Sequence, residues 1–351
     1  MLYGANGYTA RLIIKEFVGA GLKPVLAGRD QEKISALADR HGFEYSIFSL
    51  DDPNIIDEQL ADVSILINAA GPYSQTAKQI IGSCLRSKTH YIDITGEIDV
   101  FVYAESKHRD AKKAGVILCP GTGFDVIPTD CLSYILKEKL PDARELNICF
   151  FSENGRPSIG TAKTSIEGLA LGGRIRNNGI IEHVPLAHAE KEIDYGQGPK
   201  MAMSIPWGDV ATAYYSTGIP NITVYTPRSK KGIDKIKKQR KWLYFTKFKI
   251  VQNFIKNKME KKIINGGDSD EKRAQSKMWV WAEVINDSGK AVSGRFQVAN
   301  GYDVTGYGSM FYAKNILEKE FPGGYYTPST LLGPNIIESL PGFSGIEYSE
   351  N

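Results

Sequence analysis

The sequence has few cysteines, and they follow no pattern that binds a metal or builds a disulfide framework. The four cysteines stand far apart, without a Cys-x-x-Cys pair (Cys84, Cys119, Cys131 and Cys149). The five histidines form no His-Glu-x-x-His run, so the sequence predicts no metal site. Isolated thiols of this kind are typical of a reducing compartment, where they act as small buried hydrophobic residues.

The signatures of several enzyme classes and of membrane spans are also missing. The sequence contains no Gly-x-Ser-x-Gly nucleophile elbow, and no lysine of a phosphate-binding loop follows its first glycine-rich turn. Hydrolysis and phosphoryl transfer are therefore not expected. No apolar run reaches the length of a membrane span, and no charged leader precedes the first turn, so we expect a cytoplasmic protein.

What is present is the composition of an ordinary globular enzyme. The chain has 351 residues, of which 42% are hydrophobic and 24% are charged. This length is enough for two domains that each bury a core. The net charge of +3 is too small to indicate a nucleic-acid partner.

The turn Gly4-Ala5-Asn6-Gly7-Tyr8-Thr9-Ala10 is typical of a dinucleotide-binding fold. It joins a short strand at residues 1–3 to a segment, 9–18, whose apolar residues have helical spacing. Glycines in such a turn let backbone N–H groups approach a pyrophosphate at the helix N-terminus. We predict that Gly4, Asn6, Gly7, Tyr8 and Thr9 bind the cofactor. Three residues are few for a central strand, so either the strand is short or residues that would extend it are missing.

Arg29 predicts which dinucleotide is bound. Residues 23–27 are expected to form the second strand, and NAD enzymes place an acidic residue at its end to hold the ribose hydroxyl. This chain has Gly28 and then Arg29 there. Because a guanidinium can bind a 2′-phosphate bidentately, we predict NADP as the cofactor. In the alternative interpretation, Arg29 is a surface cation and Asp30 caps the next helix.

The first third of the chain alternates strand-like and helical segments, which predicts a parallel sheet covered on both faces. The fold class is therefore α/β, with a Rossmann-type doubly wound sheet. The expected strands are 25–27, 44–48, 64–69, 90–94 and 116–119, and the expected helices are 31–41, 75–86 and 100–114. Ligands bind such sheets at the carboxyl ends of the strands. The loops that follow these strands are therefore predicted to hold cofactor, and they contribute Ala70, Gly71, Pro72, Thr95 and Gly96.

After this first domain, assigned to residues 1–125, the pattern changes. Residues 126–303 mix short β-branched runs with glycine-rich turns, which predicts a second, mixed α/β domain with a mostly antiparallel sheet. Its strand candidates are 221–225, 278–286 and 293–299. Residues 304–351 form a C-terminal segment, helical over 305–320, that we expect to pack on the first domain. An exposed sheet edge in the second domain would suit a homodimer.

Residues 229–264 form a lysine-rich insertion with aromatic residues between the lysines. Two interpretations are open. A basic amphipathic helix can lie on an anionic membrane surface or bind an acidic carrier partner. Alternatively, its aromatic residues pack on the second domain and its lysines form a solvated face.

Several motifs resemble one family. Tyr-Gly-Ala-Asn-Gly-Tyr-Thr at 3–9, Asn-Ala-Ala-Gly-Pro-Tyr at 68–73 and His-Tyr-Ile-Asp-Ile-Thr-Gly-Glu at 90–97 resemble the saccharopine dehydrogenase-like oxidoreductases, in the branch that includes trans-acting enoyl reductases. The segments 123–130, 206–209, 217–220 and 323–328 extend the match. The resemblance implies a nicotinamide-dependent oxidoreductase. It does not imply lysine metabolism, because true saccharopine reductases carry different substrate-domain signatures.

Candidates for catalysis follow from what hydride transfer needs, which is positioning and a proton. Tyr73 can donate a hydrogen bond, or it can serve as an aromatic lid over the nicotinamide ribose. Asp125 can orient a substrate amine or cap the helix that follows it. Asp209 and Lys163 either face the cofactor or are merely solvated. Glu97 contacts the cofactor side, or is a first-turn carboxylate favoured by its own helix dipole. Of these, Tyr73, Asp125 and Asp209 are the catalytic predictions.

The sequence therefore predicts an NADP-dependent oxidoreductase that reduces a C=C or C=N bond of a small-molecule or lipid-linked substrate. One alternative is an amino-acid dehydrogenase that acts on a saccharopine-like secondary amine. Another is a protein that binds NADP without turnover, as a sensor or as a scaffold on a lipid surface.

Overall fold

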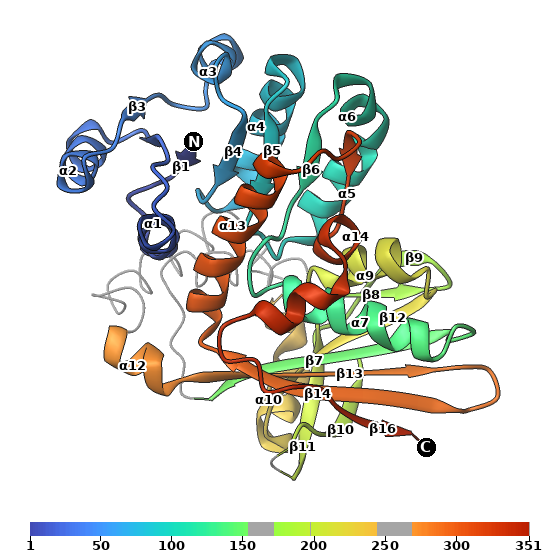
Figure 1. Ribbon diagram of the computed structural model, residues 1–351. Coiled ribbons are helices and arrows are strands. Elements are labelled where there is room, and N and C mark those ends of the chain that lie inside the picture. The colour runs from blue at the N-terminus through green and yellow to red at the C-terminus, as the bar shows by residue number, and fades with distance from the viewer. Residues whose placement is uncertain (154–171, 197, 244–268, 351) are drawn as a thin grey trace. The chain divides into compact units, whose positions relative to one another are not determined.

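The computed structural model describes residues 1–153, 172–196, 198–243 and 269–350, and these residues form two compact units (Figure 1). The first unit consists of Met1–Ile127 together with Gly301–Gly333. The second consists of Pro128–Asn300 together with Pro334–Asn351. Each unit is built around a sheet of its own.

The sheet of the first unit is parallel throughout and has the order β15-β6-β5-β4-β1-β2-β3. Its strands are β1 (Leu2–Tyr3), β2 (Leu26–Gly28), β3 (Tyr45–Ile47), β4 (Ile65–Asn68), β5 (His90–Asp93), β6 (Ile117–Cys119) and β15 (Gly324–Tyr325). The chain builds outward from β1 to β3 and then crosses to β4 on the other side of β1. This reversal is the mark of a doubly wound sheet, so the predicted fold class is confirmed.

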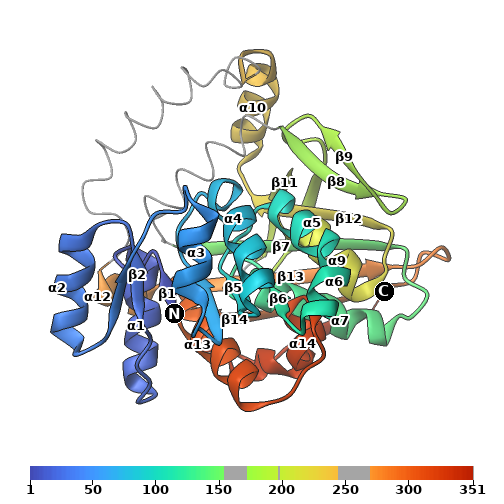
Figure 2. The ribbon, with the colours of Figure 1, turned by 90° about the horizontal axis from the view of Figure 1, so that it is seen from above.

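Helices cover both faces of this sheet. They are α1 (Tyr8–Gly19), α2 (Gln31–His41), α3 (Pro53–Leu60), α4 (Tyr73–Ser87), α5 (Ile98–Ser106), α6 (His108–Ala114), α13 (Gly301–Glu318) and α14 (Pro328–Leu332). Seen from above, α3 to α6 form a row on one side of the strands, and α1 and α13 lie on the other (Figure 2). Because both faces are covered, strands such as β4 and β6 are short, fully buried runs of mostly apolar residues rather than alternating ones.

The second unit has a mixed sheet whose main path is β10-β11-β12-β7-β13-β14-β16. Its strands are β7 (Glu145–Glu153), β8 (Gly173–Asn177), β9 (Ile180–Val184), β10 (Glu190–Asp194), β11 (Pro199–Ile205), β12 (Asn221–Pro227), β13 (Lys277–Ile285), β14 (Ala291–Ala299) and β16 (Glu347–Glu350). The pair of β12 with β7 is parallel, whereas the other strand pairs in the described part of this sheet are antiparallel. The prediction of a second, mostly antiparallel domain is therefore confirmed.

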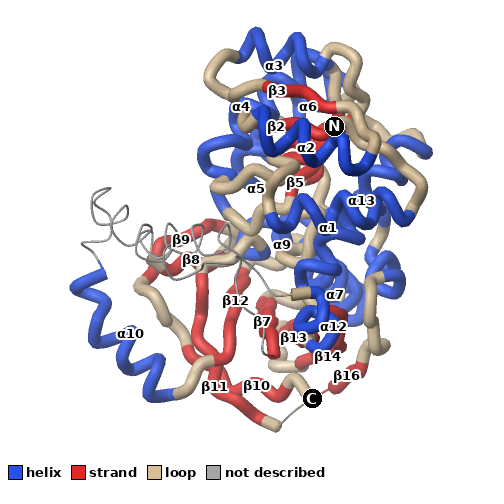
Figure 3. Tube along the Cα trace, turned by 90° about the vertical axis from the view of Figure 1, so that its left-hand side faces the viewer, coloured by secondary structure: helices blue, strands red, loops and turns tan. Residues whose placement is uncertain are grey.

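The helices of the second unit are α7 (Ile127–Lys139), which starts at the boundary, α9 (Asp209–Thr217), α10 (Lys230–Leu243) and α12 (Asp270–Gln275). The helix α10 runs beside the end of the sheet that carries β10 and β11 (Figure 3). It occupies the first part of the predicted insertion 229–264, and the remainder of that insertion lies outside the described residues.

The C-terminal segment differs from the expected single piece at 304–351. Residues Gly301–Gly333 belong to the first unit, whereas Pro334–Asn351 belongs to the second and adds β16 next to β14. Small residues let α13 approach α1 closely, since a Cβ added at Gly306 would lie 3.2 Å from the carbonyl oxygen of Leu12. The first unit also ends at Ile127 rather than at residue 125.

Candidate functional site

The site predicted from the glycine turn lies at the carboxyl ends of β1 and β4, where the direction of chain building reverses. Gly4 has a φ of +82°, which favours glycine, and a Cβ added there would lie 2.9 Å from the backbone nitrogen of Ala70. Only glycine therefore lets the loop after β1 pack on the loop after β4. The backbone N–H of Gly7 donates to the carbonyl oxygen of Gly4 at 3.0 Å, which closes the turn.

The turn leads into the N-terminus of α1, with Gly7 as the N-cap residue. Glycine has no side chain with which to cap the helix, and the first turn of α1 has no acidic residue. A helix N-terminus of this kind attracts an anion such as a phosphate, because its N–H groups and its dipole both favour negative charge. The glycine cradle and the helix end therefore fit a dinucleotide pyrophosphate. Of the neighbouring predicted residues, Tyr8 packs its ring edge-on against Tyr302, with the ring centroids 5.1 Å apart.

Arg29 and Asp30 follow β2, and the structure separates their roles. Asp30 is the N-cap of α2 and accepts a hydrogen bond from the backbone N–H of Lys33 at 3.1 Å. Its carboxylate also pairs with the Lys33 ammonium at 2.6 Å. The capping interpretation of Asp30 is therefore confirmed. Arg29 is exposed, and within the described part of the chain it makes no hydrogen bond or ion pair.

A buried chain of polar side chains supports the loops after β4 and β5. Asn68, the last residue of β4, accepts a hydrogen bond from the backbone N–H of Ala70 at 3.0 Å. Its amide nitrogen lies 3.3 Å from the hydroxyl of Tyr91, to which it donates. Tyr91 in turn donates to Asp93 Oδ2 at 2.6 Å. These side chains are fully buried, so each depends on the next for its hydrogen bond.

Asp93 connects this chain to the loops after β5 and β6. Its Oδ1 accepts hydrogen bonds from the backbone N–H groups of Thr95, at 3.0 Å, and of Gly121, at 2.8 Å. Burial raises the pKa of Asp93 to about 6, although its hydrogen bonds from Tyr91, Thr95 and Gly121 favour the charged form. Asn68, Tyr91 and Asp93 lie within the motifs at 68–73 and 90–97, but the sequence alone predicted no role for them. The signal that could have found them is a polar residue at the end of an apolar strand.

Glu97 caps a helix other than its own. Its two carboxylate oxygens accept hydrogen bonds from the backbone N–H groups of Tyr73, at 2.9 Å, and Ser74, at 2.7 Å, which begin α4. The backbone N–H of Glu97 donates to the hydroxyl of Thr95 at 3.0 Å, and Thr95 is fully buried. The side chain of Thr95 therefore supports this loop. The loops that carry Thr95 and Pro72 are joined through Glu97.

Tyr73 and Asp125, two of the predicted catalytic residues, lie in the same neighbourhood. Burial raises the pKa of Tyr73 well above its usual range, and the negative charges of Asp93, Glu97 and Asp125 raise it further. A Cβ added at Gly96 would lie 2.9 Å from Asp125 Oδ2, so the carboxyl group lies against the backbone of Gly96. Burial raises the pKa of Asp125 to about 7. Near neutral pH, Asp125 can therefore hold a proton while Tyr73 stays protonated.

The predicted catalytic residues are divided between the two units. Tyr73 and Asp125 belong to the first unit, and so do Gly71, which is exposed, and Pro72 and Gly96, which are partly buried. Asp209 belongs to the second unit, where it is the first residue of α9 and is fully buried. Asp125 lies two residues before the start of α7 at Ile127. Lys163 lies outside the described residues.

Among the described residues, no three His, Cys, Asp or Glu side chains gather in a way that could hold a metal ion. None of the described helices combines the length and the apolar character needed to cross a bilayer.

Comparisons with known proteins agree with this geometry. Residues 1–119 match the family model of the saccharopine dehydrogenase NADP binding domain. The saccharopine dehydrogenase-like oxidoreductase of Bos taurus is 23% identical over 214 residues, which cover 53% of this chain and 50% of that protein. A trans-acting enoyl reductase of Mycobacterium leprae is 24% identical over 157 residues, 42% of this chain and 38% of that protein. The resemblance to this family is confirmed.

Solved structures confirm the fold. Apo saccharopine dehydrogenase (L-Glu forming) from Saccharomyces cerevisiae has a TM-score of 0.66 at 12% identity, covering 100% of this chain and 99% of that one. Homospermidine synthase from Legionella pneumophila, solved with NAD, has a TM-score of 0.62 at 10% identity, covering 99% and 90%. In sequence, this chain spans about half the length of the curated relatives it matches.

Proposed function

Because residues 1–119 form a nucleotide-binding domain of the saccharopine dehydrogenase type, we propose that this chain is an NADP-dependent oxidoreductase that reduces a C=C or C=N bond. The observation that carries the proposal is the cradle at Gly4, where a Cβ would lie 2.9 Å from the backbone of Ala70, in front of the N-terminus of α1. This cradle suits a pyrophosphate, and the exposed guanidinium of Arg29 at the end of β2 suits a 2′-phosphate.

Each part of the site has a separate task in this proposal. A bound nicotinamide supplies the hydride. The nicotinamide lies against the loops after β4 and β5, at the carboxyl ends of these strands. These loops carry Ala70, Gly71, Pro72, Thr95 and Gly96. Asp125 supplies the proton that the product needs at the atom next to the one reduced, since its pKa of about 7 lets it hold a proton at neutral pH. Tyr73 stays protonated and donates a hydrogen bond to the acceptor.

Enoyl thioesters are the first class of substrate to test. A trans-acting enoyl reductase is among the curated relatives, and its name describes that protein. The competing candidate is an amino-acid dehydrogenase, which would form or cleave a secondary amine. The two differ in the acceptor, because an enoyl thioester offers a C=C bond, whereas an amine with a keto acid offers a C=N bond.

The test is a fluorescence titration of the purified chain with NADPH and with NADH, followed by an acceptor screen. We expect NADPH to bind more tightly than NADH, and its absorbance to fall when a 2-enoyl thioester is added. Oxidation of NADPH only with an amine and a keto acid would instead assign an amino-acid dehydrogenase. Tight binding without oxidation by any acceptor would favour the sensor, and no binding of either nucleotide would overturn the proposal.

A further inference from the structure

The positive charge of this chain is concentrated in one segment. Residues 229–264 contain thirteen lysine and arginine residues against two acidic ones, whereas the whole chain has a net charge of only +3. The rest of the chain is therefore net acidic. A charge asymmetry of this size points to an interaction with a polyanion or an anionic surface.

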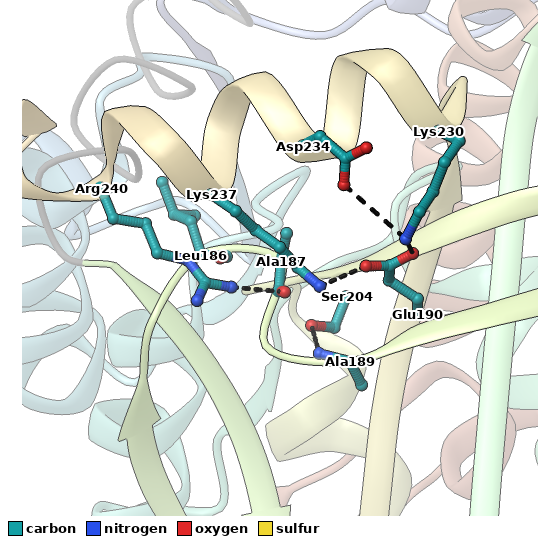
Figure 4. A network of polar contacts seen from close by, with 9 residues as sticks. All are labelled: Leu186, Ala187, Ala189, Glu190, Ser204, Lys230, Asp234, Lys237 and Arg240. Atoms are coloured by element: carbon teal, nitrogen blue, oxygen red, sulfur yellow. Dashed lines mark hydrogen bonds and ion pairs between the residues drawn. The ribbon is translucent and has the colours of Figure 1, made fainter.

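One face of α10 is used to attach this helix to the second unit. Glu190, the first residue of β10, accepts a hydrogen bond from the ammonium group of Lys230 at 2.6 Å and also pairs with Lys237 (Figure 4). The two ammonium groups lower the pKa of Glu190. Between them along the helix, Ile233 is fully buried. The inward face of α10 is thus held by two ion pairs and an apolar contact.

A third attachment lies further along the same face. The guanidinium of Arg240 donates to the carbonyl oxygens of Leu186, at 2.7 Å, and Ala187, at 2.6 Å (Figure 4). Ala187 has a φ of +53° and is fully buried, so Arg240 binds a tight turn in front of β10. Contacts at Lys230, Lys237 and Arg240 fix the rotation of α10 about its own axis.

With its rotation fixed, α10 presents a second set of lysines outward. Lys231, Lys235 and Lys238 are exposed, and their spacing of four and three residues places them on one side of the helix. We call these three residues the outer lysine face. Within the described part of the chain none of them has an ion pair, and Asp234 is paired with Lys230 on the inward side. Like charges at this spacing repel one another, so these three lysines do not stabilise α10 by pairing with each other.

We propose that the outer lysine face binds the anionic headgroup surface of a phospholipid bilayer. A flat anionic surface can contact the three lysines of one helix face at the same time, and their positive charges attract it. The sequence that follows α10 also favours lipid, because it contains Tyr244, Phe245 and Phe248 among further lysines, and aromatic rings suit a membrane interface.

The test is sedimentation of the full chain with vesicles. Vesicles of phosphatidylcholine alone are compared with vesicles that contain about 30% phosphatidylserine, at ionic strengths from about 0.1 M to about 1 M. We expect binding to the anionic vesicles alone, lost at the higher ionic strength. The triple variant Lys231→Gln, Lys235→Gln, Lys238→Gln should bind on the order of 100-fold more weakly, since each lysine near such a surface contributes about fivefold.

The matched control removes the same number of positive charges from another part of the chain. Lys23, Lys112 and Lys113 are exposed residues of the first unit, and replacing all three with Gln should leave vesicle binding within about twofold of the wild type. Circular dichroism checks that each variant is folded. Equal binding to both kinds of vesicle, no binding to either, or equal losses in the two triple variants would each overturn the proposal. So would a preference for an acidic peptide over the anionic vesicles. The readout needs no nucleotide, so it is independent of the proposed function.

Discussion

Asp93 Oδ1 accepts a hydrogen bond from the backbone N–H of Gly121 at 2.8 Å, and this contact joins the loop after β5 to the loop after β6. The same oxygen holds the loop that contains Thr95, and the other carboxylate oxygen is held by Tyr91. One buried carboxyl group thus fixes the loop after β5, which the proposed function assigns to the nicotinamide, and the loop after β6, which carries Asp125. Its removal should disturb both the stability of the first unit and the shape of the site.

We predict that Asp93→Ala lowers the free energy of unfolding by about 3 kcal/mol, because it leaves buried N–H and O–H donors without acceptors. Asp93→Asn should cost less, since its amide oxygen can still accept from Thr95 and Gly121. Urea denaturation followed by circular dichroism measures both. The control is Asp39→Ala on the exposed side of α2, which should change the free energy by less than about 0.5 kcal/mol. Similar losses in Asp39→Ala and Asp93→Ala would contradict the assigned role.

Glu97→Gln is predicted to loosen the start of α4. A glutamine presents an N–H group where the carboxylate now accepts from Tyr73 or Ser74, so one cap bond is lost at a cost of about 1 kcal/mol. The loop of Ala70, Gly71 and Pro72 immediately precedes these residues, so NADPH should also bind several times more weakly. Thermal unfolding and fluorescence titration measure the two effects. Glu105→Gln, an exposed change on α5, should alter neither.

The sequence predicts the first unit well because its signals are local. The Gly4 turn, the following helix and the alternation of segments lie within short windows, and the helix expected at 31–41 matches α2. Elements that form by pairing with a strand far away in the sequence were not predicted. β15 has only two residues and pairs with β6, about two hundred residues earlier in the chain. The short helix α3 was also not predicted, and the helix expected at 100–114 is divided at Lys107 into α5 and α6.

The contacts among the residues of the candidate site could not be predicted from the sequence. Glu97 was expected either to contact the cofactor or to be a first-turn carboxylate stabilised by the dipole of its own helix. In the structure it caps α4, which begins 24 residues earlier in the chain. Asn68, Tyr91 and Asp93 act together only because parallel strands bring their ends to one edge of the sheet. No spacing rule in the sequence connects such partners. In contrast, Asp30 and Lys33 lie three residues apart, and that cap follows from the sequence directly.

Arg29→Ala is predicted to weaken NADPH binding by about 10- to 100-fold and to leave NADH binding unchanged. A charge-assisted hydrogen bond to a phosphate contributes about 1.5–3 kcal/mol, and NADH has no 2′-phosphate to accept one. The matched control is Arg40→Ala, which removes an exposed arginine of α2 at its other end. Equal titration curves for NADPH in the two variants would remove the basis for NADP preference.

Asp125 is predicted to give the reductase a pH dependence near neutrality. Its pKa of about 7 means that the proton needed for reduction is lost as the pH rises through this value. The rate of NADPH oxidation should therefore fall about tenfold per pH unit above pH 7 in the wild type. Asp125→Asn should be slow at every pH and show no such fall. A wild-type profile that stays flat from about pH 6 to about pH 9 would exclude Asp125 as the proton donor.

Stability should depend on pH through the same carboxyl group. A folded-state pKa of about 7 lies above the ordinary value of 3.8, so between these values the folded chain binds more protons than the unfolded chain. The free energy of unfolding therefore falls as the pH rises from about 4 to about 7, by a few kcal/mol at most. Asp93, with a pKa of about 6, contributes in the same direction but over a lower range. Asp125→Asn should remove the fall above about pH 6 and about half of the fall between about pH 4 and about pH 6, where Asp93 also contributes. Denaturation midpoints across this range would show it, with Asp39→Asn as the control that keeps the full wild-type slope.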